Sequence, residues 1–373
     1  MILRSIRDID VRGKRVILRA GLNVPVRDGV VLNDFRLRKA LSTIVYLSSR
    51  GARTVIVSHL GREDESLRPV YETLKGLLKD VRIIFSEASP GEELLVAQES
   101  LRDGDCLMLE NIRRGDGEET ADHDFARKIA MAGDIFVQDA FADAHRSHAS
   151  IVTVPKLLPS YAGLLVEEEV RVLSEALAPT HPALAIVGGA KFETKEPLLE
   201  KMLSLYDSVC LGGAIVNDYF RAQGFEVGES LVSEKKMPAS LFSNTKLTTP
   251  TDVVVALGDV TRTSFPDAVQ KGETIVDIGP ATIQAWGEMI CNSHFVVWNG
   301  PLGVYEGGFN EGTAKLAQAI VESGVRAVVG GGDTVAALVR AGFDEKKVFL
   351  STGGGAMLEF LAKGTLPGLK ALF

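Results

Sequence analysis

Short runs of apolar, mostly β-branched residues alternate along the chain with longer stretches in which apolar residues recur at helical spacing. The short runs predict strands, which we place at Arg15–Arg19, Thr54–Ser58, Val81–Phe85, Cys106–Glu110, Ile135–Gln138, Leu184–Val187, Ser208–Leu211, Val253–Ala256, Thr274–Asp277, Phe295–Trp298, Ala327–Val329 and Val348–Leu350. The longer stretches, such as LRKALSTIVYLSSRG and TAKLAQAIVESG, predict helices that end at a glycine. Strands that alternate with helices form parallel sheets with both faces covered, so the pattern predicts an α/β fold.

One segment that carries two prolines interrupts the alternation. Pro155 and Pro159 precede a helical pattern at Tyr161–Leu177, which the sequence APTHP then ends. With 373 residues the chain is too long for a single core of ordinary size. We therefore expect two Rossmann-like domains with parallel sheets, joined by a helical hinge. The expected ranges are residues 1–160, the hinge at 161–178, residues 179–352, and a C-terminal segment, 353–373, that packs back on the hinge and the first domain.

Composition narrows the class of protein. Hydrophobic residues make up 46% of the chain and charged residues 24%, which is typical of a soluble globular protein. Charges interrupt the segment MILRSIRDIDVRGKR, and no apolar run reaches the roughly 20 residues of a membrane span, so we expect a cytoplasmic protein. The net charge of −8 argues against binding to nucleic acids or anionic membranes. Cys106, Cys210 and Cys291 lack metal-site spacing, and we expect each to be a small core residue.

The predicted strands of the first half end in cationic and imidazole side chains. Arg19 ends the first strand and Asn23 follows it, and the ends of later strands continue into the segments SHLGR, LENIRR and QDAFADAHRSH. Arg36 lies just downstream of the first of these ends. Ligands of open α/β sheets bind beyond the carboxyl ends of the strands. Arginine forks match phosphate and carboxylate oxygens, so this half predicts a site for a small polyanion.

The predicted strands of the second half end in glycines instead. The segments are VGGAK, LGGA, DIGPAT, WNGPLG, VVGGGDT and LSTGGG, and several lead straight into helices. Glycines let backbone N–H groups approach a ligand, and a helix N-terminus favours negative charge, so the repeated pattern indicates a nucleotide site. The chain has no GxxxxGK[ST] loop, no GxGxxG that opens a first βαβ unit, and no HRD or DFG motif. These absences argue against P-loop enzymes, ordinary dinucleotide dehydrogenases and protein kinases.

Taken together, these motifs resemble those of phosphoglycerate kinases. The resemblance runs from about Leu18 to Gly368 and rests on NVP, SHLGR, LENxR, DAFxxAHRxH, GGAK, WNGPxGVxE, GGGDT and STGGGAxLE, in the family's order. It implies a phosphotransferase that moves a phosphoryl group reversibly between 1,3-bisphosphoglycerate with ADP and 3-phosphoglycerate with ATP, in glycolysis or gluconeogenesis. It also implies that the first domain binds the glycerate and the second the nucleotide. Direct in-line transfer after domain closure, and a monomer, are further expectations.

The resemblance carries over to individual residues. Those that match the family's glycerate-binding positions are Asn23, Arg36, His59, Leu60, Gly61, Arg62, Arg113 and Arg146. Those that match its nucleotide-binding positions are Lys191, Lys195, Glu306, Gly331, Gly332, Asp333 and Thr334. The implied catalytic set is Arg36, Lys191, Gly332 and Gly354, where the glycines stand for helix N-termini. Asp333 is expected to bind Mg²⁺ that arrives with the nucleotide, as MgATP or MgADP.

Some roles stay open at this point. Asp333 is alternatively the N-cap of a helix. Glu110 and Asn111 suit either a contact with the ligand or the orientation of a neighbouring arginine. His145 and His148, which we leave out of the site, suit either hydrogen-bonded core positions or ligand contacts.

Departures from the family pattern keep a second function open, a paralogue that binds ligand or nucleotide with little turnover. Gly21 and Leu22 stand where the family usually has Asp and Phe, Ala142 and Asp143 where it commonly has Gly and Thr, and AKFETKE replaces AKVSDKI. Because Gly21 lacks a carboxylate, we expect weakened substrate binding with activity kept, and a lower KM for 3-phosphoglycerate in Gly21→Asp. A dehydrogenase is a weaker alternative, since its fingerprint is missing.

Overall fold

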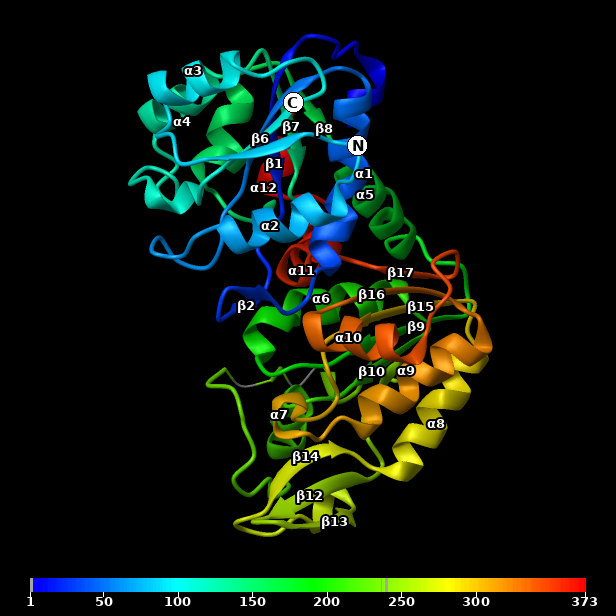
Figure 1. Ribbon diagram of the computed structural model, residues 1–373. Coiled ribbons are helices and arrows are strands. Elements are labelled where there is room, and N and C mark those ends of the chain that lie inside the picture. The colour runs from blue at the N-terminus through cyan, green and yellow to red at the C-terminus, as the bar shows by residue number, and fades with distance from the viewer. Residues whose placement is uncertain (1–2, 236, 239–240) are drawn as a thin grey trace. The chain divides into compact units, whose positions relative to one another are not determined.

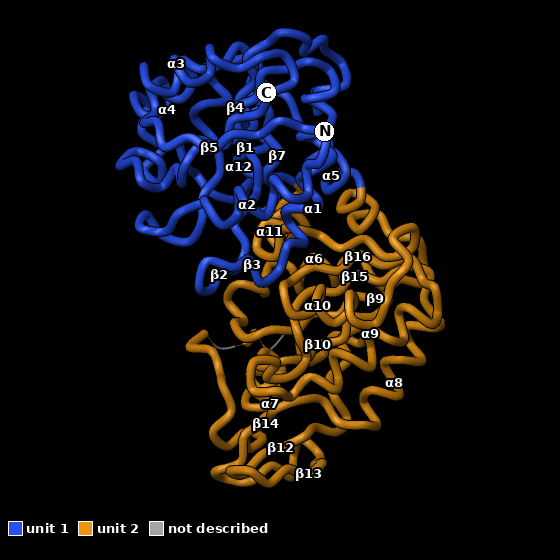
Figure 2. The backbone as a smooth tube through the Cα atoms, in the orientation of Figure 1, with its two compact units in different colours: residues 1–171, 365–373 blue, residues 172–364 orange. Residues whose placement is uncertain are grey.

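The computed structural model describes residues 3–235, 237–238 and 241–373. The chain forms two compact units, residues 1–171 with 365–373 (unit 1) and residues 172–364 (unit 2), coloured separately in Figure 2. Each unit contains a six-stranded parallel sheet with helices packed on it (Figure 1). The predicted α/β class is confirmed. The expected functional division into residues 1–160, 161–178, 179–352 and 353–373 stays a prediction.

The sheet of unit 1 has its first strand near the centre. Its strand order is β5-β6-β4-β1-β7-β8, and all neighbouring pairs are parallel. The strands are β1 (Arg15–Ala20), β4 (Arg53–Val57), β5 (Ile83–Ser86), β6 (Cys106–Leu109), β7 (Ile135–Asp139) and β8 (Ser160–Ala162). The helices are α1 (Phe35–Ser49), α2 (Arg68–Leu77), α3 (Glu92–Glu99), α4 (His123–Ala130), α5 (Leu164–Ala176), which runs on into unit 2, and α12 (Pro367–Lys370). A small hairpin consists of β2 (Val26–Arg27) and β3 (Val30–Val31).

The parallel sheet of unit 2 has the order β11-β10-β9-β15-β16-β17. Its strands are β9 (Ala183–Val187), β10 (Ser208–Leu211), β11 (Leu247–Thr248), β15 (Phe295–Asn299), β16 (Arg326–Gly330) and β17 (Val348–Leu350). The helices that accompany it are α6 (Phe192–Leu205), α7 (Ile215–Ala222), α8 (Pro280–Cys291), α9 (Glu311–Ser323), α10 (Gly332–Ala341) and α11 (Gly354–Lys363). The predicted glycine stop of α9 is confirmed, because Gly324 caps it in the left-handed conformation with φ 62°.

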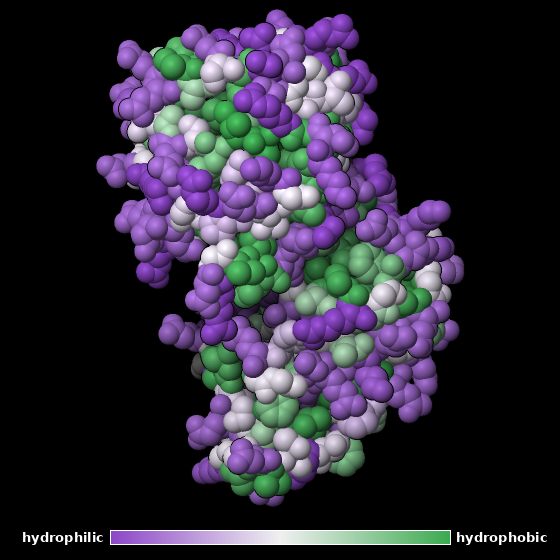
Figure 3. Space-filling model, in the orientation of Figure 1, coloured by the Kyte–Doolittle hydropathy of each residue, from purple (hydrophilic) through white to green (hydrophobic). Residues whose placement is uncertain are grey.

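The prediction of parallel pairing was wrong for two of the strands. β12 (Val253–Leu257) and β14 (Thr274–Ile278) pair antiparallel in a separate three-stranded sheet with β13 (Val260–Ser264), which the pattern did not predict. Gly258, with φ 59°, allows the tight turn between β12 and β13. The side chains of β13 are exposed over nearly the whole strand, including Val260. Its sequence therefore lacks the continuous apolar run that predicts a buried strand. Hydrophobic and hydrophilic residues mix on the surface over this sheet (Figure 3).

The helix predicted at Tyr161–Leu177 begins later than expected. Ser160–Ala162 is the edge strand β8, which pairs with β7, and α5 begins at Leu164. Three residues are too few to show the alternating pattern of a strand, so the sequence pattern assigns them to the helix that follows. The expectation of a buried cysteine was also wrong for Cys291, which is exposed, whereas Cys106 and Cys210 are buried.

A buried carboxyl group at the end of β7 caps α5. Asp139 Oδ1 accepts hydrogen bonds from the backbone N–H groups of Leu165, at 3.0 Å, and Val166, at 3.4 Å. Its other oxygen, Oδ2, has no hydrogen-bond partner among the described residues. Burial raises the pKa of Asp139 from 3.8 to about 8, although the donated hydrogen bonds oppose this shift. The helix therefore begins on a carboxyl group that is protonated at neutral pH.

This pKa predicts a pH-dependent contribution to stability. Between pH about 4 and pH about 8 the unfolded chain has released the proton of Asp139 while the folded protein retains it, so the free energy of unfolding falls as the pH rises through this window. Asp139→Asn keeps an oxygen that accepts from α5 and has no proton to lose. We expect its thermal midpoint, measured by circular dichroism from pH 4 to 8, to fall less steeply than that of the wild type. Equal slopes in the two proteins would contradict the raised pKa.

Candidate functional site

The loops that carry the predicted glycerate-binding residues leave neighbouring strands of unit 1. The loop with Asn23 follows β1, the loop with His59 follows β4, Arg113 follows β6 and Arg146 follows β7. β4, β1 and β7 are consecutive in the sheet and β6 lies beside β4. Because the strands are parallel, these loops leave the same edge of the sheet.

Hydrogen bonds join four of the predicted residues directly. Arg36, in the first turn of α1, donates from Nη1 to the carbonyl oxygen of Asn23 at 2.7 Å. The side-chain oxygen of Asn23 accepts from the backbone N–H of Gly61 at 3.3 Å, and Arg113 Nη1 donates to the carbonyl oxygen of Gly61. The structure thus brings Asn23, Arg36, Gly61 and Arg113 together.

The other predicted residues of this unit differ in exposure. His59 and Leu60 are buried, at 1% and 2% exposure, whereas Arg62 is exposed. Arg146 lies with its Nε 3.9 Å from a carboxylate oxygen of Asp143. A Cβ added at Gly21 would lie 3.4 Å from Cα of Ala140, so the backbone leaves room for a Cβ there.

Asn111 and Glu110 hold the loop that joins β4 to α2. Asn111 is 2% exposed, and its side-chain nitrogen Nδ2 donates to the carbonyl oxygens of Leu60, Arg62 and Glu65 at 2.8, 2.8 and 2.9 Å. Its oxygen Oδ1 accepts from the backbone N–H groups of Leu60 and Arg113, at 3.2 Å each. These contacts favour the orienting role for Asn111 that the sequence left open.

Glu110 acts on the same loop from its other end. Its Oε1 accepts from the backbone N–H of Leu67 at 2.7 Å, and its Oε2 accepts from the hydroxyl of Ser66 at 2.7 Å. Arg114 lies 3.2 Å from this carboxylate. Two adjacent side chains thus fix both ends of the loop, and with it the backbone of SHLGR.

A buried polar network lies behind His59. Arg19, fully buried, donates from Nε to the hydroxyl of Ser150 at 2.9 Å, and its Nη2 lies 3.0 Å from Nδ1 of His59. Asp143, 4% exposed, places Oδ2 3.2 Å from Arg19 Nη2 and 3.5 Å from His59 Nδ1. Ser150 in turn donates to Glu118, which is 1% exposed, at 2.5 Å. Burial and the neighbouring arginines lower the pKa of His59 to about 3, so the ring is neutral.

Motif matching missed this network. The signal was present in Arg19, an arginine within an apolar strand, because a buried guanidinium needs a carboxylate partner. The sequence does not say which carboxylate this is, since Asp143 and Glu118 are distant in the chain. His148, left open above, lies with Nδ1 3.9 Å from Glu118 Oε1, and its pKa is lowered chiefly by burial.

In unit 2, glycines let three strand ends approach each other. A Cβ on Gly300, which follows β15 with φ 94°, would lie 2.5 Å from the carbonyl oxygen of Gly188. A Cβ on Gly213, with φ 64°, would lie 2.5 Å from the backbone nitrogen of Gly189. Such distances exclude side chains, so these glycines are required by backbone contact after β9, β10 and β15. The glycine-rich segments are therefore partly structural.

A cavity of about 630 Å³ opens beside these strand ends and brings two of the predicted acids together. Asp333, in the first turn of α10, and Glu306 both line it. Burial, and then the negative charge of Glu306, raise the pKa of Asp333. The N-cap of α10 is Gly331 and Asp333 is the second residue of the helix, so the alternative role of Asp333 as N-cap is wrong.

The remaining predicted residues of unit 2 surround the helix N-termini. Lys191 is exposed and precedes α6, while Lys195 is 7% exposed and donates from Nζ to Oδ1 of Asn299. Burial lowers the pKa of Lys195 to about 7. A Cβ on Gly354 would lie 3.8 Å from Cα of Gly331, so the N-termini of α10 and α11 are neighbours.

Two further predicted residues, Gly332 and Thr334, differ in how closely other atoms surround them. Apart from its neighbours in the chain and the helix backbone, no heavy atom of the described residues lies within 4 Å of a Cβ added at Gly332, so the start of α10 is open. Thr334 is fully buried, and its hydroxyl has no hydrogen-bond partner among the described residues.

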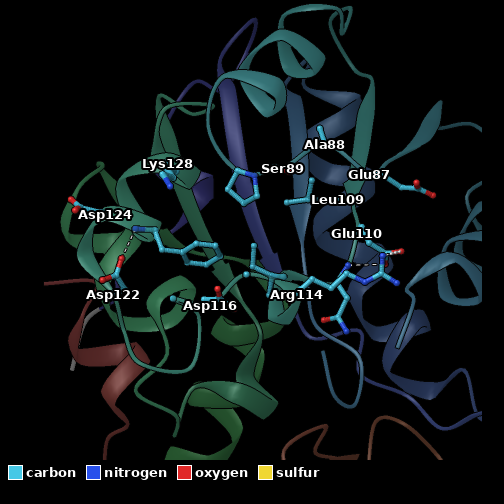
Figure 4. A pocket seen from close by; sticks show the side chains of 16 residues that line it. Glu87, Ala88, Ser89, Leu109, Glu110, Arg114, Asp116, Asp122, Asp124 and Lys128 are labelled. Carbon is cyan, nitrogen blue, oxygen red and sulfur yellow. Dashed lines mark hydrogen bonds and ion pairs between the residues drawn. The ribbon is translucent and has the colours of Figure 1, made fainter. Parts of the chain in front are cut away.

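A cavity of about 590 Å³ in unit 1 holds none of the predicted glycerate-binding residues. Arg114 and Glu110 lie on one side of it, and Asp122, Asp124 and Lys128 on the other (Figure 4). Its charged lining consists of two cations against five acids, which are Glu87, Glu110, Asp116, Asp122 and Asp124. This charge suits a polyanion poorly.

Comparison with known proteins agrees with the resemblance. The family model for phosphoglycerate kinase matches residues 6–364. The chain belongs to the phosphoglycerate kinase family. Similar members include phosphoglycerate kinases of Thermus thermophilus, 42% identical over 390 residues, and of a Roseiflexus species, 40% identical over 393 residues. The alignments cover 99% and 100% of this chain and 100% and 99% of those relatives.

Solved phosphoglycerate kinase structures share the fold. That from Coxiella burnetii has a TM-score of 0.82 at 36% identity and covers 100% of this chain and 99% of its own. That from Pyrococcus horikoshii has a TM-score of 0.86 at 29% identity, with coverage of 99% and 98%. Among the described residues, no helix combines the length and apolar character needed to cross a membrane.

The contacts of Asn111 predict the effect of one substitution in this phosphoglycerate kinase fold. Asn111→Asp keeps an acceptor for Leu60 and Arg113 but replaces the donor that faces three carbonyl oxygens with an acceptor. We expect the free energy of unfolding, measured with urea, to fall by about 1–3 kcal/mol. Asn33→Asp is the matched control, because Asn33 is exposed and its side-chain oxygen accepts from the backbone N–H of Phe35 at 2.9 Å. Equal effects of the two substitutions would contradict the donor role.

Proposed function

We propose that this chain is an active phosphoglycerate kinase, which transfers a phosphoryl group reversibly between 1,3-bisphosphoglycerate with ADP and 3-phosphoglycerate with ATP. The observation that carries the proposal is the family match along residues 6–364, which includes both the arginine-bearing and the glycine-bearing strand ends. The place of the reaction in glycolysis or gluconeogenesis, a cytoplasmic location and a monomeric state belong to the same proposal. No observation favours the binding paralogue.

The glycerate belongs, in this proposal, to unit 1. Arg36, Arg62, Arg113 and Arg146 supply cationic forks for the phosphate and carboxylate of the substrate. Asn23, His59, Leu60 and Gly61 complete the predicted pocket. Support comes from the hydrogen bonds that join Asn23, Arg36, Gly61 and Arg113.

The nucleotide belongs to unit 2. Glu306 accepts hydrogen bonds from the ribose, and Lys191, Lys195 and the backbone at Gly331 and Gly332 face the phosphates. Thr334, whose buried hydroxyl lacks a hydrogen-bond partner among the described residues, completes the phosphate loop. Support comes from the cavity beside α10, because the first turn of a helix presents backbone N–H groups that favour an anion.

The reaction needs alignment and charge neutralisation but no protein nucleophile. In the direction of ATP use, a carboxylate oxygen of 3-phosphoglycerate attacks the γ-phosphorus, and the bond from phosphorus to the bridging oxygen of ADP breaks. Arg36 and Lys191 neutralise the transferred group, and the N-termini of α10 and α11, at Gly332 and Gly354, donate N–H groups to it. The units close on their ligands so that water does not take the phosphoryl group.

The described residues fit a magnesium ion that arrives with the nucleotide. They contain no cluster of three or more His, Cys, Asp or Glu side chains suited to a metal. Mg²⁺ is commonly bound by one or two carboxylates together with substrate phosphates, and Asp333 in the first turn of α10 offers such a carboxylate. The ion would offset phosphate charge there.

A coupled assay tests the proposal. With 3-phosphoglycerate, MgATP and glyceraldehyde-3-phosphate dehydrogenase, formation of the acyl phosphate appears as oxidation of NADH. We expect turnover that depends on all three added components. Folded protein that binds ATP in calorimetry yet gives no turnover would support the binding paralogue instead.

Asp333→Asn tests the magnesium role. The amide is a weaker ligand for Mg²⁺, so we expect the KM for MgATP to rise about tenfold while the KM for 3-phosphoglycerate stays unchanged. Asp344→Asn is the matched control, because Asp344 is exposed and its carboxylate accepts from the backbone N–H of Lys346, at 2.9 Å. An unchanged KM for MgATP in Asp333→Asn would assign the metal to another group.

A further inference from the structure

Arg19 places a permanent charge in the interior of unit 1. Its side chain has no exposure, and it lies in β1 near the centre of the sheet. Guanidinium does not lose its proton in proteins, so a buried arginine requires an ionised partner. Two carboxylates qualify by position: Asp143, 3.2 Å away, and Glu118, which reaches Arg19 through Ser150.

Of the two, Asp143 contacts Arg19 directly, whereas Glu118 acts through Ser150. Burial alone would raise the pKa of Asp143, but the charges of Arg19, Arg36 and Arg146 hold it below its ordinary value. Burial raises the pKa of Glu118 in spite of Arg19 and Ser150. Oδ2 of Asp143 faces Arg19 as a charge contact and has no aligned hydrogen bond among the described residues.

The position of Arg19 decides the tautomer of His59. Arg19 Nη2 lies 3.0 Å from His59 Nδ1, and a guanidinium nitrogen can only donate. Nδ1 therefore accepts, and in the neutral ring the proton must be on Nε2. His59 Nε2 is buried and has no hydrogen-bond partner among the described residues. A donor without an acceptor inside a predicted anion site indicates a ligand oxygen as its partner.

We propose that Asp143 is a positioning residue of the glycerate site: its carboxylate holds Arg19 against Nδ1 of His59, so that His59 offers Nε2–H to a substrate oxygen as a neutral donor. This inference rests on the proposed function. The charge that attracts the substrate then comes from the surrounding arginines, while His59 adds a directed hydrogen bond. Asp143 acts through Arg19 and His59 and does not itself contact the substrate.

The proposal changes the expectation for Gly21. Arg19 and Gly21 are two residues apart at the end of β1, where alternate side chains leave the same face. A carboxylate is missing at Gly21, but Asp143 supplies one to Arg19 from the loop after β7. Binding need not be weakened, because the carboxylate comes from a different loop.

The first test uses Asp143→Asn, which removes the charge at nearly constant shape. In the coupled assay we expect the KM for 3-phosphoglycerate to rise about tenfold, as for a lost hydrogen bond to a charged ligand, while kcat and the KM for MgATP change less than about twofold. Asp143→Thr, which carries the residue common in the family, should behave alike and serves if the amide variant folds poorly. An unchanged KM for 3-phosphoglycerate in a folded variant would overturn the proposal.

The matched control is Asp134→Asn, at the opposite end of the same strands. Asp134 Oδ1 lies 2.7 Å from Nη2 of Arg15, the first residue of β1, so this is also an Arg–Asp pair between β1 and the β7 region. We expect this substitution to lower stability and leave both KM values unchanged. If it raised the KM for 3-phosphoglycerate as much as Asp143→Asn does, the effect would be general destabilisation and the proposal would fail.

The second test reads His59 directly and needs no activity. In ¹⁵N-histidine-labelled protein without ligand, with His59→Asn for assignment, the ring nitrogens should show a proton on Nε2 alone between pH about 5 and 8. Asp143→Asn should populate both tautomers. A proton on Nδ1 in the wild type, or an unchanged single tautomer in Asp143→Asn, would contradict the proposal. Because this readout is independent of turnover, an inactive wild type would count against the proposed function alone.

The third test uses Gly21→Asp. With Asp143 in place, a second carboxylate near Arg19 meets like charge, so we expect the KM for 3-phosphoglycerate to stay the same or rise. A lower KM, as the sequence alone suggested, would show that Arg19 still lacks the carboxylate and would count against the role of Asp143.

Discussion

Parallel strand pairing decides where recognition groups can collect in this protein. When neighbouring strands run in the same direction, the loops that follow them leave one edge of the sheet, whatever their distance in sequence. In unit 1 this places the loops with Asn23, His59, Arg113 and Arg146 after β1, β4, β6 and β7. In unit 2 the same rule gathers glycine-rich loops after β9, β10 and β15. The antiparallel sheet of β12, β13 and β14 does not follow this rule, and it flanks the cavity with its strands rather than with loops.

Loops at a shared edge require support, and each unit provides it differently. In unit 1, side chains hold the loops in place. Asn111 donates hydrogen bonds to the backbone on both sides of Arg62, and Arg19 contacts the ring of His59. In unit 2, the backbone itself holds the loops in place, because glycines allow main-chain atoms of adjacent loops to touch. Side-chain support suits a polyanion that arginine forks bind, and backbone support suits phosphates that backbone N–H groups bind.

Most of the fold could be predicted from the sequence because buried parallel strands are continuous apolar runs. The strands that the pattern missed lack a long apolar run. β8 and the short strands β2, β3 and β11 are too short to show a period, and β13 is exposed. The arginines of the candidate site could be found because their place after a strand is local information. The partnership of Arg19 with Ser150 could not, because 131 residues separate them and only the folded chain pairs them.

The burial of Lys195 has a consequence beyond the position of its side chain. An amine whose pKa is about 7 is only partly charged at neutral pH. If phosphate oxygens come close, they favour the charged form, so the protein takes up protons from solution as the anion binds. Anion affinity would then fall as the pH rises above 7, and the heat of binding would depend on the ionisation enthalpy of the buffer. Anion binding to unit 2 would thus depend on pH through this one buried amine.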